Sequence, residues 1–129
     1  MSFIIRDMAD KDYKSIQDVA LESWRVTYEG IIPQKIQDHF LQVAYRDEMM
    51  EKRMHSSHIF VAEMANEVVG FADFSPADEG GRSELRAFYL YPQQQGIGIG
   101  SALLRKGIEE LEDIKEIVVD VEKENIVGK

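Results

Sequence analysis

Three glycines at alternate positions, Gly96, Gly98 and Gly100, stand directly before a helical pattern in this chain of 129 residues. Glycine inside regular structure costs roughly 0.5–1 kcal/mol relative to alanine, so three together indicate a specific backbone requirement. A strand that leads into a helix through glycines exposes unpaired N–H groups at the positive end of the helix dipole. A Cβ atom would hold an anion away from those amides. The segment therefore predicts a phosphate-binding turn, to which Arg105 and Lys106 add local positive charge.

Two known phosphate motifs fit these glycines poorly. A Walker A loop requires Lys followed by Ser or Thr after its last glycine, and no register of the triplet supplies that pair. A dinucleotide-binding fingerprint, G-x-G-x-x-G, has Ser101 at its third glycine position when it starts at Gly96. It has Leu103 there when it starts at Gly98. Asp120 stands about where the ribose-binding acid would be, so a dinucleotide-binding fragment is kept as an alternative.

The hydrophobic pattern predicts one domain with a mixed sheet and helices, in the order β-α-α-β-β-β-α-β. The expected elements are a strand at 3–8, a helix starting at Asp10 or Asp12 and reaching Trp24, a helix over 34–54, strands at 58–64, 68–74 and 83–91, a helix after the glycines, and a strand over 115–125. Asn66 tolerates a positive φ and predicts a tight antiparallel hairpin between two of these strands. The composition of 75–82 predicts an exposed loop. Gly107 would let the last helix approach the sheet closely.

A third phosphate motif does fit, because the stretch from Gln95 to Gly100 reads Q-x-x-G-x-G and continues as "SALL". It resembles the pyrophosphate-binding motif of the GCN5-related N-acetyltransferases, the GNAT family. "LRAFYLYP" resembles their fourth strand, "ESWRVTYEGIIP" their first helical region, and "EKENIVGK" the segment after their fifth strand. The likeness covers essentially the whole chain, and polyamine-acetylating members are the most similar.

This resemblance implies the α/β fold of the GNAT acyl-CoA N-acyltransferases, as a single domain over 1–129. It also implies an N-acetyltransferase that moves an acetyl group from acetyl-CoA directly to a primary amine. The acceptor would be a small molecule, a polyamine or a peptide. Members of the family are often dimers, so a homodimer is a further expectation.

The resemblance assigns the co-substrate contacts to the fourth strand and to the turn after it. A bulge would free backbone amides near Phe88, Tyr89 and Leu90 to hold the pantetheine arm and to polarise the thioester carbonyl. Asn125 would contact the arm further along. Amides of the turn would hold the pyrophosphate; these are Gln95, Gly96, Ile97, Gly98, Ile99, Gly100 and Ser101.

Glu84, on the expected fourth strand, is the candidate general base. An alkyl amine has a pKa near ~10.4 and must lose a proton before it attacks a thioester. Alternation along the strand predicts that Glu84 shares a face with Phe88 and Leu90. The alternative is that Glu84 simply pairs with Arg86 or with a cation on a neighbouring strand. The chain contains no cysteine, so a covalent cysteinyl intermediate is excluded.

Three residues near the end of the first helix are candidates for the acceptor site. Trp24 and Tyr28 would line the acceptor pocket by resemblance, or they are ordinary core aromatics. Glu29 would attract a cationic acceptor, or it is a solvated carboxylate. No metal site is predicted, because the three histidines lack acidic partners at ligand spacing.

The chain stops at Lys129, soon after Asn125. In the GNAT family this asparagine is followed by a helix with a tyrosine that protonates the departing thiolate, and then by further strands. We therefore expect the C-terminal helix and strands, and with them the usual tyrosine acid, to be missing. This leaves a second hypothesis open, a catalytically impaired acyl-CoA-binding module.

The net charge of −9 argues against nucleic acid as a partner, because nucleic-acid binders usually carry basic surface. An acidic surface would instead attract cationic ligands such as amines, or it merely keeps the protein soluble. No apolar run approaches the ~20 residues that a membrane-spanning helix needs, and the N-terminus lacks a signal-peptide pattern. We therefore expect a cytoplasmic protein that has no membrane partner.

Overall fold

A mixed five-stranded sheet runs through the computed structural model, which describes residues 2–94, 96–111 and 114–119. The strands are β1 Ile4–Asp7, β2 His58–Met64, β3 Glu67–Phe74, β4 Arg82–Leu90 and β5 Glu116–Val119. They lie in chain order, and every neighbouring pair is antiparallel except β4 and β5, which are parallel. The predicted mixed sheet is confirmed. A single parallel pair does not make the parallel sheet on which a dinucleotide-binding fingerprint depends.

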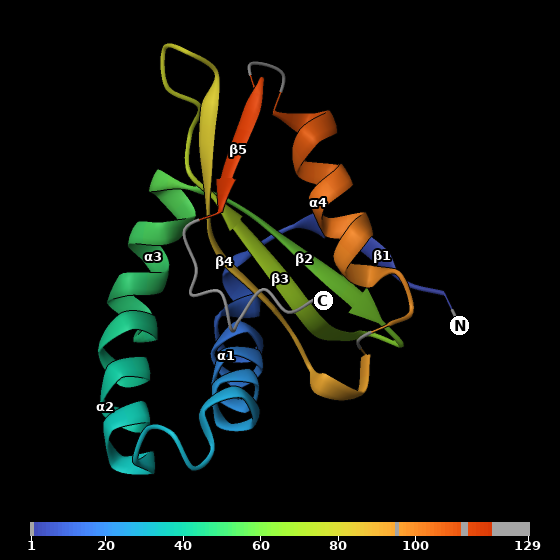
Figure 1. Cartoon of the computed structure of the whole chain (residues 1–129). Coiled ribbons are helices and arrows are strands. Elements are labelled where there is room, and N and C mark those ends of the chain that lie inside the picture. The colour runs from blue at the N-terminus through green and yellow to red at the C-terminus, as the bar shows by residue number, and fades with distance from the viewer. Residues whose placement is uncertain (1, 95, 112–113, 120–129) are drawn as a thin grey trace.

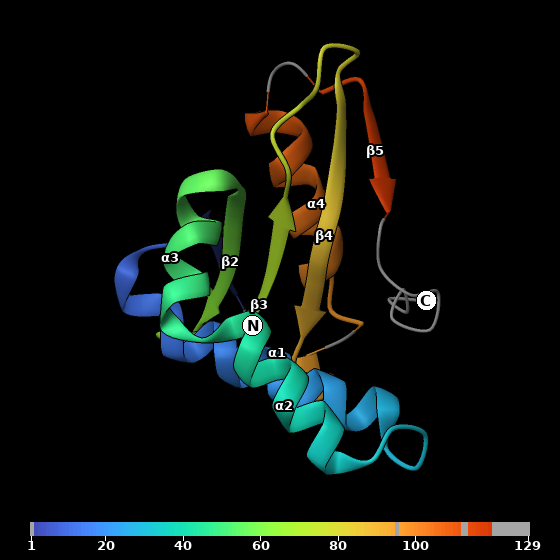
Figure 2. The same ribbon diagram turned by 90° about the vertical axis from the view of Figure 1, so that its left-hand side faces the viewer.

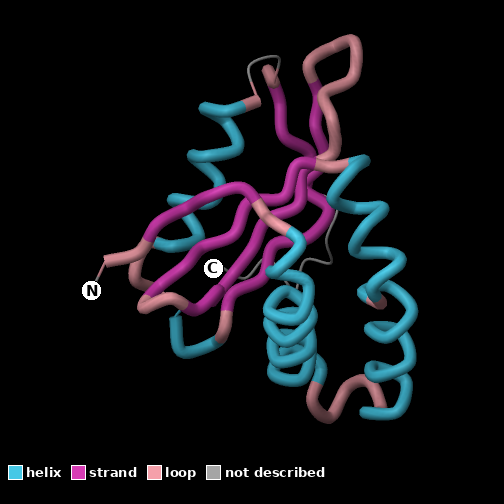
Figure 3. Tube along the Cα trace, turned by 180° about the vertical axis from the view of Figure 1, so that it is seen from behind, coloured by secondary structure: helices cyan, strands magenta, loops and turns pink. Residues whose placement is uncertain are grey.

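Helices cover both faces of the sheet (Figure 1). They are α1 Tyr13–Tyr28, α2 Gln34–Tyr45, α3 Asp47–Ser56 and α4 Ile99–Glu110, with short 3-10 turns at Asp10–Asp12 and Pro92–Gln94. The helices α1 and α3 pack on one face, α4 packs on the other, and α2 rests on α1 and α3, as the view from behind also shows (Figure 3). None of the helices in the described part of the chain is both long and apolar enough to cross a membrane.

Two hydrophobic cores, one on each face of the sheet, hold these layers together. The core under α1 and α3 includes Ile16, Val19, Met50, Phe71 and Ala87. The core under α4 includes Phe60, Phe74, Leu85, Ile99 and Leu103. Burying one such aliphatic or aromatic side chain stabilises the fold by about 1.5–3 kcal/mol. The two cores therefore fix which side chains of each strand face which helices.

Gly107 lies where α4 crosses the ring of Phe74. A Cβ atom at this position would approach three ring carbons of Phe74 closer than 3.0 Å. The ring is fully buried and cannot move aside without disturbing the core. The expectation that Gly107 permits close approach of the last helix to the sheet is confirmed.

The helix expected over 34–54 is two helices, which is the main departure from the predicted element order. Arg46 interrupts it with an extended backbone, at φ −64° and ψ 162°. The side chain of Gln17 donates to the Tyr45 carbonyl at 2.7 Å and to the Asp47 carboxylate at 3.0 Å, so α1 satisfies polar groups at the break. Because the stabilising contact comes from a distant helix, hydrophobic spacing alone does not reveal the interruption.

The hairpin between β2 and β3 confirms the expectation at Asn66. Ala65 and Asn66 both have positive φ, 53° and 67°, as a two-residue type I′ turn requires. The turn directs β2 and β3 into an antiparallel pair that pairs His58 with Phe74 at its far end. This pairing places the end of β3 next to the chain segment that leads into β4.

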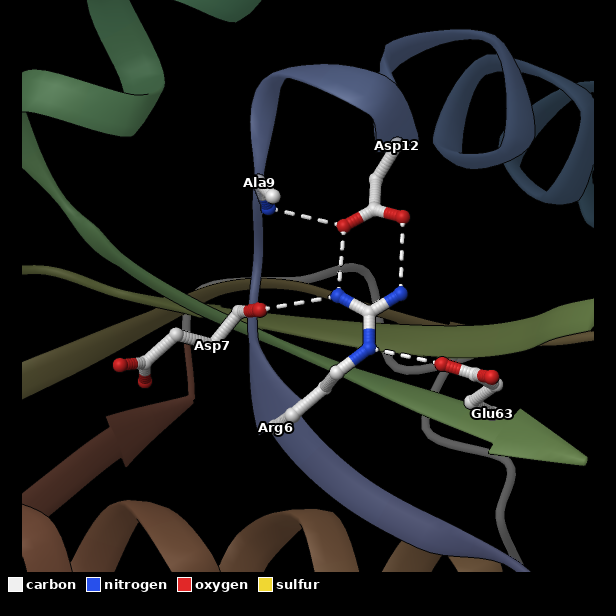
Figure 4. Close-up of polar contacts among 5 residues, drawn as sticks. All are labelled: Arg6, Asp7, Ala9, Asp12 and Glu63. Atoms are coloured by element: carbon white, nitrogen blue, oxygen red, sulfur yellow. Dashed lines mark hydrogen bonds and ion pairs between the residues drawn. The ribbon is translucent and has the colours of Figure 1, made fainter. Parts of the chain in front are cut away.

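Arg6 ties β1 to the start of α1 and to β2 (Figure 4). Its guanidinium binds both carboxylate oxygens of Asp12, at 2.8 and 2.9 Å, and donates through Nε to Glu63 at 2.8 Å. The Asp12 carboxylate also accepts the Ala9 N–H at 2.8 Å and makes no capping bond to α1. Asp12 was expected as an N-cap; it precedes the helix, but its side chain serves this cluster instead.

Burial alone would raise the pKa of Asp12, but the bonds from Arg6 and Ala9 hold it below its usual value. We expect Asp12→Asn to lower the free energy of unfolding by about 2 kcal/mol at pH 7, because a buried charge-assisted pair is lost. A carboxyl group with a lowered native pKa stabilises the fold above its unfolded pKa of ~3.9 and loses that contribution as pH falls through the native value. The free energies of unfolding of the wild type and of Asp12→Asn, measured with urea, should therefore become equal at acid pH.

The exposed Lys14–Asp18 pair supplies the control for this measurement. Asp18→Asn should change the unfolding free energy by no more than about 0.5 kcal/mol. If Asp12→Asn lowers the free energy of unfolding as little as Asp18→Asn does, the contacts of Arg6 with Asp12 do not stabilise the fold as proposed.

Candidate functional site

The glycine turn before α4 adopts the backbone that its residue types permit. Gly96 and Gly98 have φ of 87° and 89°, in the left-handed region that L side chains rarely adopt. A Cβ atom added at either position would meet no other atom within 4 Å. Both glycines are therefore required by backbone conformation rather than by a crowded contact, and the space beside the turn is open.

The N-terminus of α4 follows directly and carries unpaired donors. The Ala102 N–H makes a bond to the Gly98 carbonyl at 3.1 Å, so the preceding three amides, from Ile99 to Ser101, have no acceptor within the helix. Gly98 has no side chain to cap them. The Ile99 side chain is 1% exposed and packs in the core, which holds this end of the helix in place. The result is a fixed set of outward N–H groups at the positive end of a helix dipole.

The third glycine has a different cause. A Cβ atom at Gly100 would lie 3.1 Å from the ring of Phe88, on β4. Gly100 therefore lets the first turn of α4 sit against the strand that precedes the turn. The alternate spacing of the glycines thus combines two backbone requirements with one packing requirement.

β4 contains a bulge at Arg86. In the register between β3 and β4, Asp73 faces Ala87 whereas Phe74 faces Leu85, so Arg86 has no partner. A bulge was expected near Phe88 to Leu90, and the structure places it shortly before that segment. Such an extra residue bends the strand and changes where its groups point.

The bulge inverts the side-chain alternation of β4. Leu85, Phe88 and Leu90 all pack on the α4 side of the sheet, although 85 is odd and the others are even. Ala87 packs on the opposite side, under α1 and α3. Glu84 precedes the bulge and alternates with Leu85, so it faces α1 and α3. The expectation that Glu84 shares a face with Phe88 and Leu90 is wrong, because Arg86 shifts the phase by one residue.

Backbone bonds around the end of β4 show where its amides point. The Tyr91 N–H donates to the Val69 carbonyl of β3 at 2.9 Å. The Leu90 carbonyl faces the other way and accepts the Ser23 hydroxyl of α1 at 2.9 Å. Because N–H groups alternate along a strand, those of Phe88 and Leu90 point away from β3. Both candidate donors therefore lie on the outer edge of β4.

The described residues of β5 pair with the first half of β4. The pairs run from Arg82 with Glu116 to Leu85 with Val119. Figure 2 shows β5 turning away from β4 toward its C-terminal end. Within the described residues no strand pairs with the outer edge of β4 after Leu85, so the amides of Phe88 and Leu90 face a side from which another extended chain could approach.

An aromatic group on α1 and α2 lies against the same end of β4. Trp24 donates through its indole N–H to the Tyr89 hydroxyl at 3.0 Å. The Trp24 ring stacks on Phe40 with centroids 4.6 Å apart and contacts Tyr28 at 4.7 Å. Burial raises the pKa of Tyr89, partly opposed by the bond from Trp24. Trp24 and Tyr28 are thus packed aromatics whose cluster reaches the strand that carries the candidate amide donors.

A pocket of about 460 Å³ lies at the connection between α1 and α2 and is lined in part by Glu29 and Gln37. Its apolar wall includes Val26, Ile31 and Ile32. Gln37 is 3% exposed and donates to the Ile32 carbonyl at 2.8 Å, while its Oε1 atom has no hydrogen-bond partner among the described residues. The carboxylate and the aliphatic wall suit a ligand with an alkyl chain and an N–H donor.

A buried ion pair anchors α3 to the sheet opposite the bulge. Asp73 of β3 is 0% exposed and binds the Arg53 guanidinium at 2.8 Å, which in turn lies 4.6 Å from the centre of the Tyr45 ring. Burial raises the pKa of Asp73, against the opposing charge of Arg53. Arg86, the bulged residue, donates to the Ser57 hydroxyl at the end of α3 at 3.2 Å. At the bulge, both β3, through Asp73, and β4, through Arg86, are therefore bonded to α3 or to its end.

The profile of the "Acetyltransferase (GNAT) family" matches residues 15–127 of the chain. This protein belongs to the GNAT family. The match covers β4, the glycine turn and α4 together, which is the region where the unpaired amides gather.

Three relatives show how far this GNAT likeness extends. The uncharacterized N-acetyltransferase YuaI of Bacillus subtilis is 36% identical over 109 residues, which cover 81% of this chain and 62% of YuaI, so the chain spans under two thirds of that relative. The spermidine N(1)-acetyltransferase of Thermoplasma acidophilum is 26% identical over 99% of this chain and 83% of its own. The crystal structure of PaiA N-acetyltransferase from Thermoplasma acidophilum, in complex with coenzyme A, superposes with a TM-score of 0.89 at 25% identity and covers 99% of this chain and 84% of that one.

Most of the site residues expected from the GNAT resemblance lie in the described structure, on β4, the turn and α1. Gln95 and Asn125 lie outside the described residues. Arg86 bonds to Ser57, and no ion pair joins it to Glu84 in the described part of the chain. No group of three potential metal ligands comes together within residues 2–94, 96–111 and 114–119. The residues that sequence reasoning missed are polar groups that bond outside their own helix or strand: Ser23, Gln37, Arg53, Asp73 and Ser75.

We expect Arg53→Met to lower the free energy of unfolding by about 3 kcal/mol, because it leaves the Asp73 carboxylate buried without its counter-charge. The double variant Arg53→Met/Asp73→Leu removes both charges and should recover a large part of that loss. Urea unfolding of the two variants and the wild type measures the difference. A double variant less stable than Arg53→Met alone would show that the pair is not what makes the single change costly.

Proposed function

We propose that this GNAT protein transfers an acetyl group from acetyl-CoA directly to a primary amine of a small molecule, polyamine or peptide. One observation carries the proposal: the outer amides of β4 lead, through two left-handed glycines, into the uncapped N-terminus of α4. The described residues thus present two sets of N–H donors in sequence along one side of the molecule. Support comes from PaiA, a structural neighbour that was crystallised with coenzyme A.

The donors fit the chemistry of coenzyme A. A diphosphate needs closely spaced N–H groups without side chains in front of them, and Gly96, Gly98 and the amides from Ile99 to Ser101 meet that need. The pantetheine arm carries amide groups that can pair with an extended strand, and the outer edge of β4 offers the N–H groups of Phe88 and Leu90. Gln95 and Asn125 are proposed to add contacts, as the family resemblance implies.

Acetyl-CoA supplies an activated acyl group when it is bound, and the chain must supply positioning and proton transfer. The amine nitrogen forms a bond to the acyl carbon, and the bond from that carbon to sulfur breaks. Coenzyme A leaves as a thiolate, which takes up the proton that the nitrogen loses on becoming an amide, directly or through water. One of the N–H groups of Phe88 and Leu90 stabilises negative charge on the acyl oxygen, an effect worth about 3 kcal/mol for one donor in other enzymes, and the other pairs with the pantetheine arm. Glu84 accepts the proton that the ammonium ion must release, directly or through water.

The face occupied by Glu84 supports this role. Because of the bulge, its carboxylate points to the side of the sheet that carries α1, from which Trp24 and Tyr28 reach the end of β4. The amides of Phe88 and Leu90 lie on the edge of the same strand. Direct transfer between two substrates requires a base on the side of the acceptor amine and hydrogen-bond donors on the side of acetyl-CoA, and this strand provides both.

The acceptor is proposed to be an amine that carries positive charge. Glu29 borders the pocket between α1 and α2, where Ile31 would contact a methylene chain. A net charge of −9 favours the approach of cations. The Thermoplasma acidophilum relative that covers almost the whole chain is named a spermidine N(1)-acetyltransferase, which is consistent with a polyamine acceptor.

The activity is tested by incubating the protein with acetyl-CoA and a panel of polyamines, monoamines and peptides, and reading products by mass spectrometry. We expect acetylated amines, a kcat about 100-fold lower for Glu84→Gln, and a raised KM for diamines with Glu29→Gln. Binding of coenzyme A without any acetylated product would favour the alternative of an acyl-CoA-binding module. A stabilisation by NAD but not by coenzyme A would contradict both.

Gly98→Ala tests the turn. The substitution forces a side chain into the left-handed region and should cost about 1–2 kcal/mol of stability, while shifting the amides that follow and raising the Kd for coenzyme A about 10-fold. Gly30, between α1 and α2, has a similar φ of 78° and open space around it, so Gly30→Ala is the matched control. The Gly30→Ala variant should lose a similar amount of stability. Calorimetry should show no change in its affinity for coenzyme A. Equal affinity for both variants would argue against diphosphate binding at the turn.

A further inference from the structure

Ser75 lies directly after β3, opposite Glu84. Its main-chain N–H donates to the Glu84 carbonyl oxygen at 2.9 Å. In a regular hydrogen-bonded pair of antiparallel strands, the Glu84 N–H would return a bond to the Ser75 carbonyl. It donates instead to the Ser75 hydroxyl oxygen at 2.8 Å. The side chain of Ser75 therefore replaces its own carbonyl as the acceptor.

The Ser75 carbonyl is turned elsewhere and is also satisfied. It accepts the Ser83 hydroxyl at 2.7 Å, while the Ser75 hydroxyl itself donates to the Pro76 carbonyl at 3.3 Å. Ser75 is 6% exposed and Ser83 is 0% exposed, so water does not compete freely for these groups. We call Ser75, Ser83 and the main chain of Glu84 the serine clasp. The loop at 75–82 was expected to be exposed, and Ser75 departs from that expectation because it closes this clasp.

The serine clasp sits where three features of the sheet meet. Glu84 pairs with Val118 on its other side, and the next residue, Leu85, pairs with Val119, the last described residue of β5. The bulge at Arg86 follows immediately. The clasp therefore holds β4 directly before the bulge, on the opposite edge from the paired strand β5 (Figure 2).

We propose that Ser75 is a positioning residue that acts through Glu84, a role that rests on the acetyl transfer proposed above. By accepting the Glu84 N–H, its hydroxyl keeps β4 in the register that places the extra residue at Arg86. That register turns the Glu84 carboxylate toward α1 and α3, the acceptor side. A slip of one residue would turn Glu84 to the α4 side, since side chains alternate along a strand.

Ser75→Ala removes the acceptor and leaves the Glu84 N–H unpaired. We expect kcat to fall about 10-fold, because a small displacement of a reacting group has effects of this size, while the KM for acetyl-CoA changes less than about threefold. Ser75→Thr keeps a hydroxyl on a strand-compatible side chain and should restore most of the rate. Ser56→Ala is the control, since the Ser56 hydroxyl bonds only to Lys52 within the exposed surface of α3.

A double variant separates positioning from a general loss of structure. If Ser75 acts through Glu84, adding Ser75→Ala to Glu84→Gln should lower kcat less than about twofold. A full 10-fold loss in that background, or a kcat unchanged in Ser75→Ala alone, would overturn the role. Either result leaves the proposed acetyl transfer standing, provided that the wild type acetylates an amine.

Amide hydrogen exchange adds a readout that does not depend on activity. Exchange at the Glu84 N–H should be at least about 10-fold faster in Ser75→Ala than in the wild type or in Ser75→Thr. If Ser75→Ala does not fold, Ser83→Ala can be used instead, because it removes the hydroxyl that bonds to the Ser75 carbonyl. It should also lower kcat and speed exchange at the Glu84 N–H. Unchanged exchange in these variants would overturn the clasp. A wild-type protein that acetylates no amine would remove the proposed function, and the role of Ser75 in it, whatever the exchange data.

Discussion

The extra residue in β4 is the constraint on which the functional arrangement depends. Without Arg86 as a bulge, strict alternation would put Glu84 on the same face as Phe88, under α4. With it, one strand presents a carboxylate to the helices of one face and a phenylalanine to the helix of the other. The same irregularity follows directly after Leu85, which pairs with the last described residue of β5.

The bulge is held by polar groups that have little freedom to rearrange. The serine clasp fixes β4 before the extra residue, and Arg86 is bound to Ser57 at the end of α3. Asp73, opposite the following residue of β4, is buried against Arg53. An unpaired buried polar group costs about 1–3 kcal/mol, so each of these bonds penalises a change of register. The bulge is thus specified by tertiary contacts from β3, from the loop after it and from α3.

These contacts explain which parts of the structure could be predicted from the sequence. Local chemistry was sufficient for the Asn66 hairpin, for the close approach at Gly107 and for the glycine turn, because each depends on a residue type and its immediate neighbours. It failed at Arg46, where Gln17 from another helix satisfies the break. It failed again at Ser75, which has the composition of a loop but a partner nine residues ahead.

The face of Glu84 shows why the candidate site was harder to predict than the fold. The residue types on β4 were identified from resemblance, but the direction of each side chain depends on counting residues along the strand. A single unpaired residue reverses that count for everything after it. Its position is set by bonds that hydrophobic periodicity does not encode. The sequence could therefore predict which residues belong to the candidate site. The direction in which their side chains point could be determined only from the register between β3 and β4.

The helix α1 contacts both of the proposed substrate sites. Consecutive residues of α1 bind consecutive residues of β4: Ser23 holds the Leu90 carbonyl and Trp24 bonds to the Tyr89 hydroxyl. The first contact occupies the carbonyl on the outer edge but leaves the adjacent N–H of Leu90 available. The second leads through stacked rings toward the pocket between α1 and α2. Because both contacts start from neighbouring positions of one helix, α1 links the proposed acceptor side to the strand that presents the amide donors. Direct transfer needs this coupling, since the amine and the acyl carbon must be held within bonding reach at the same time.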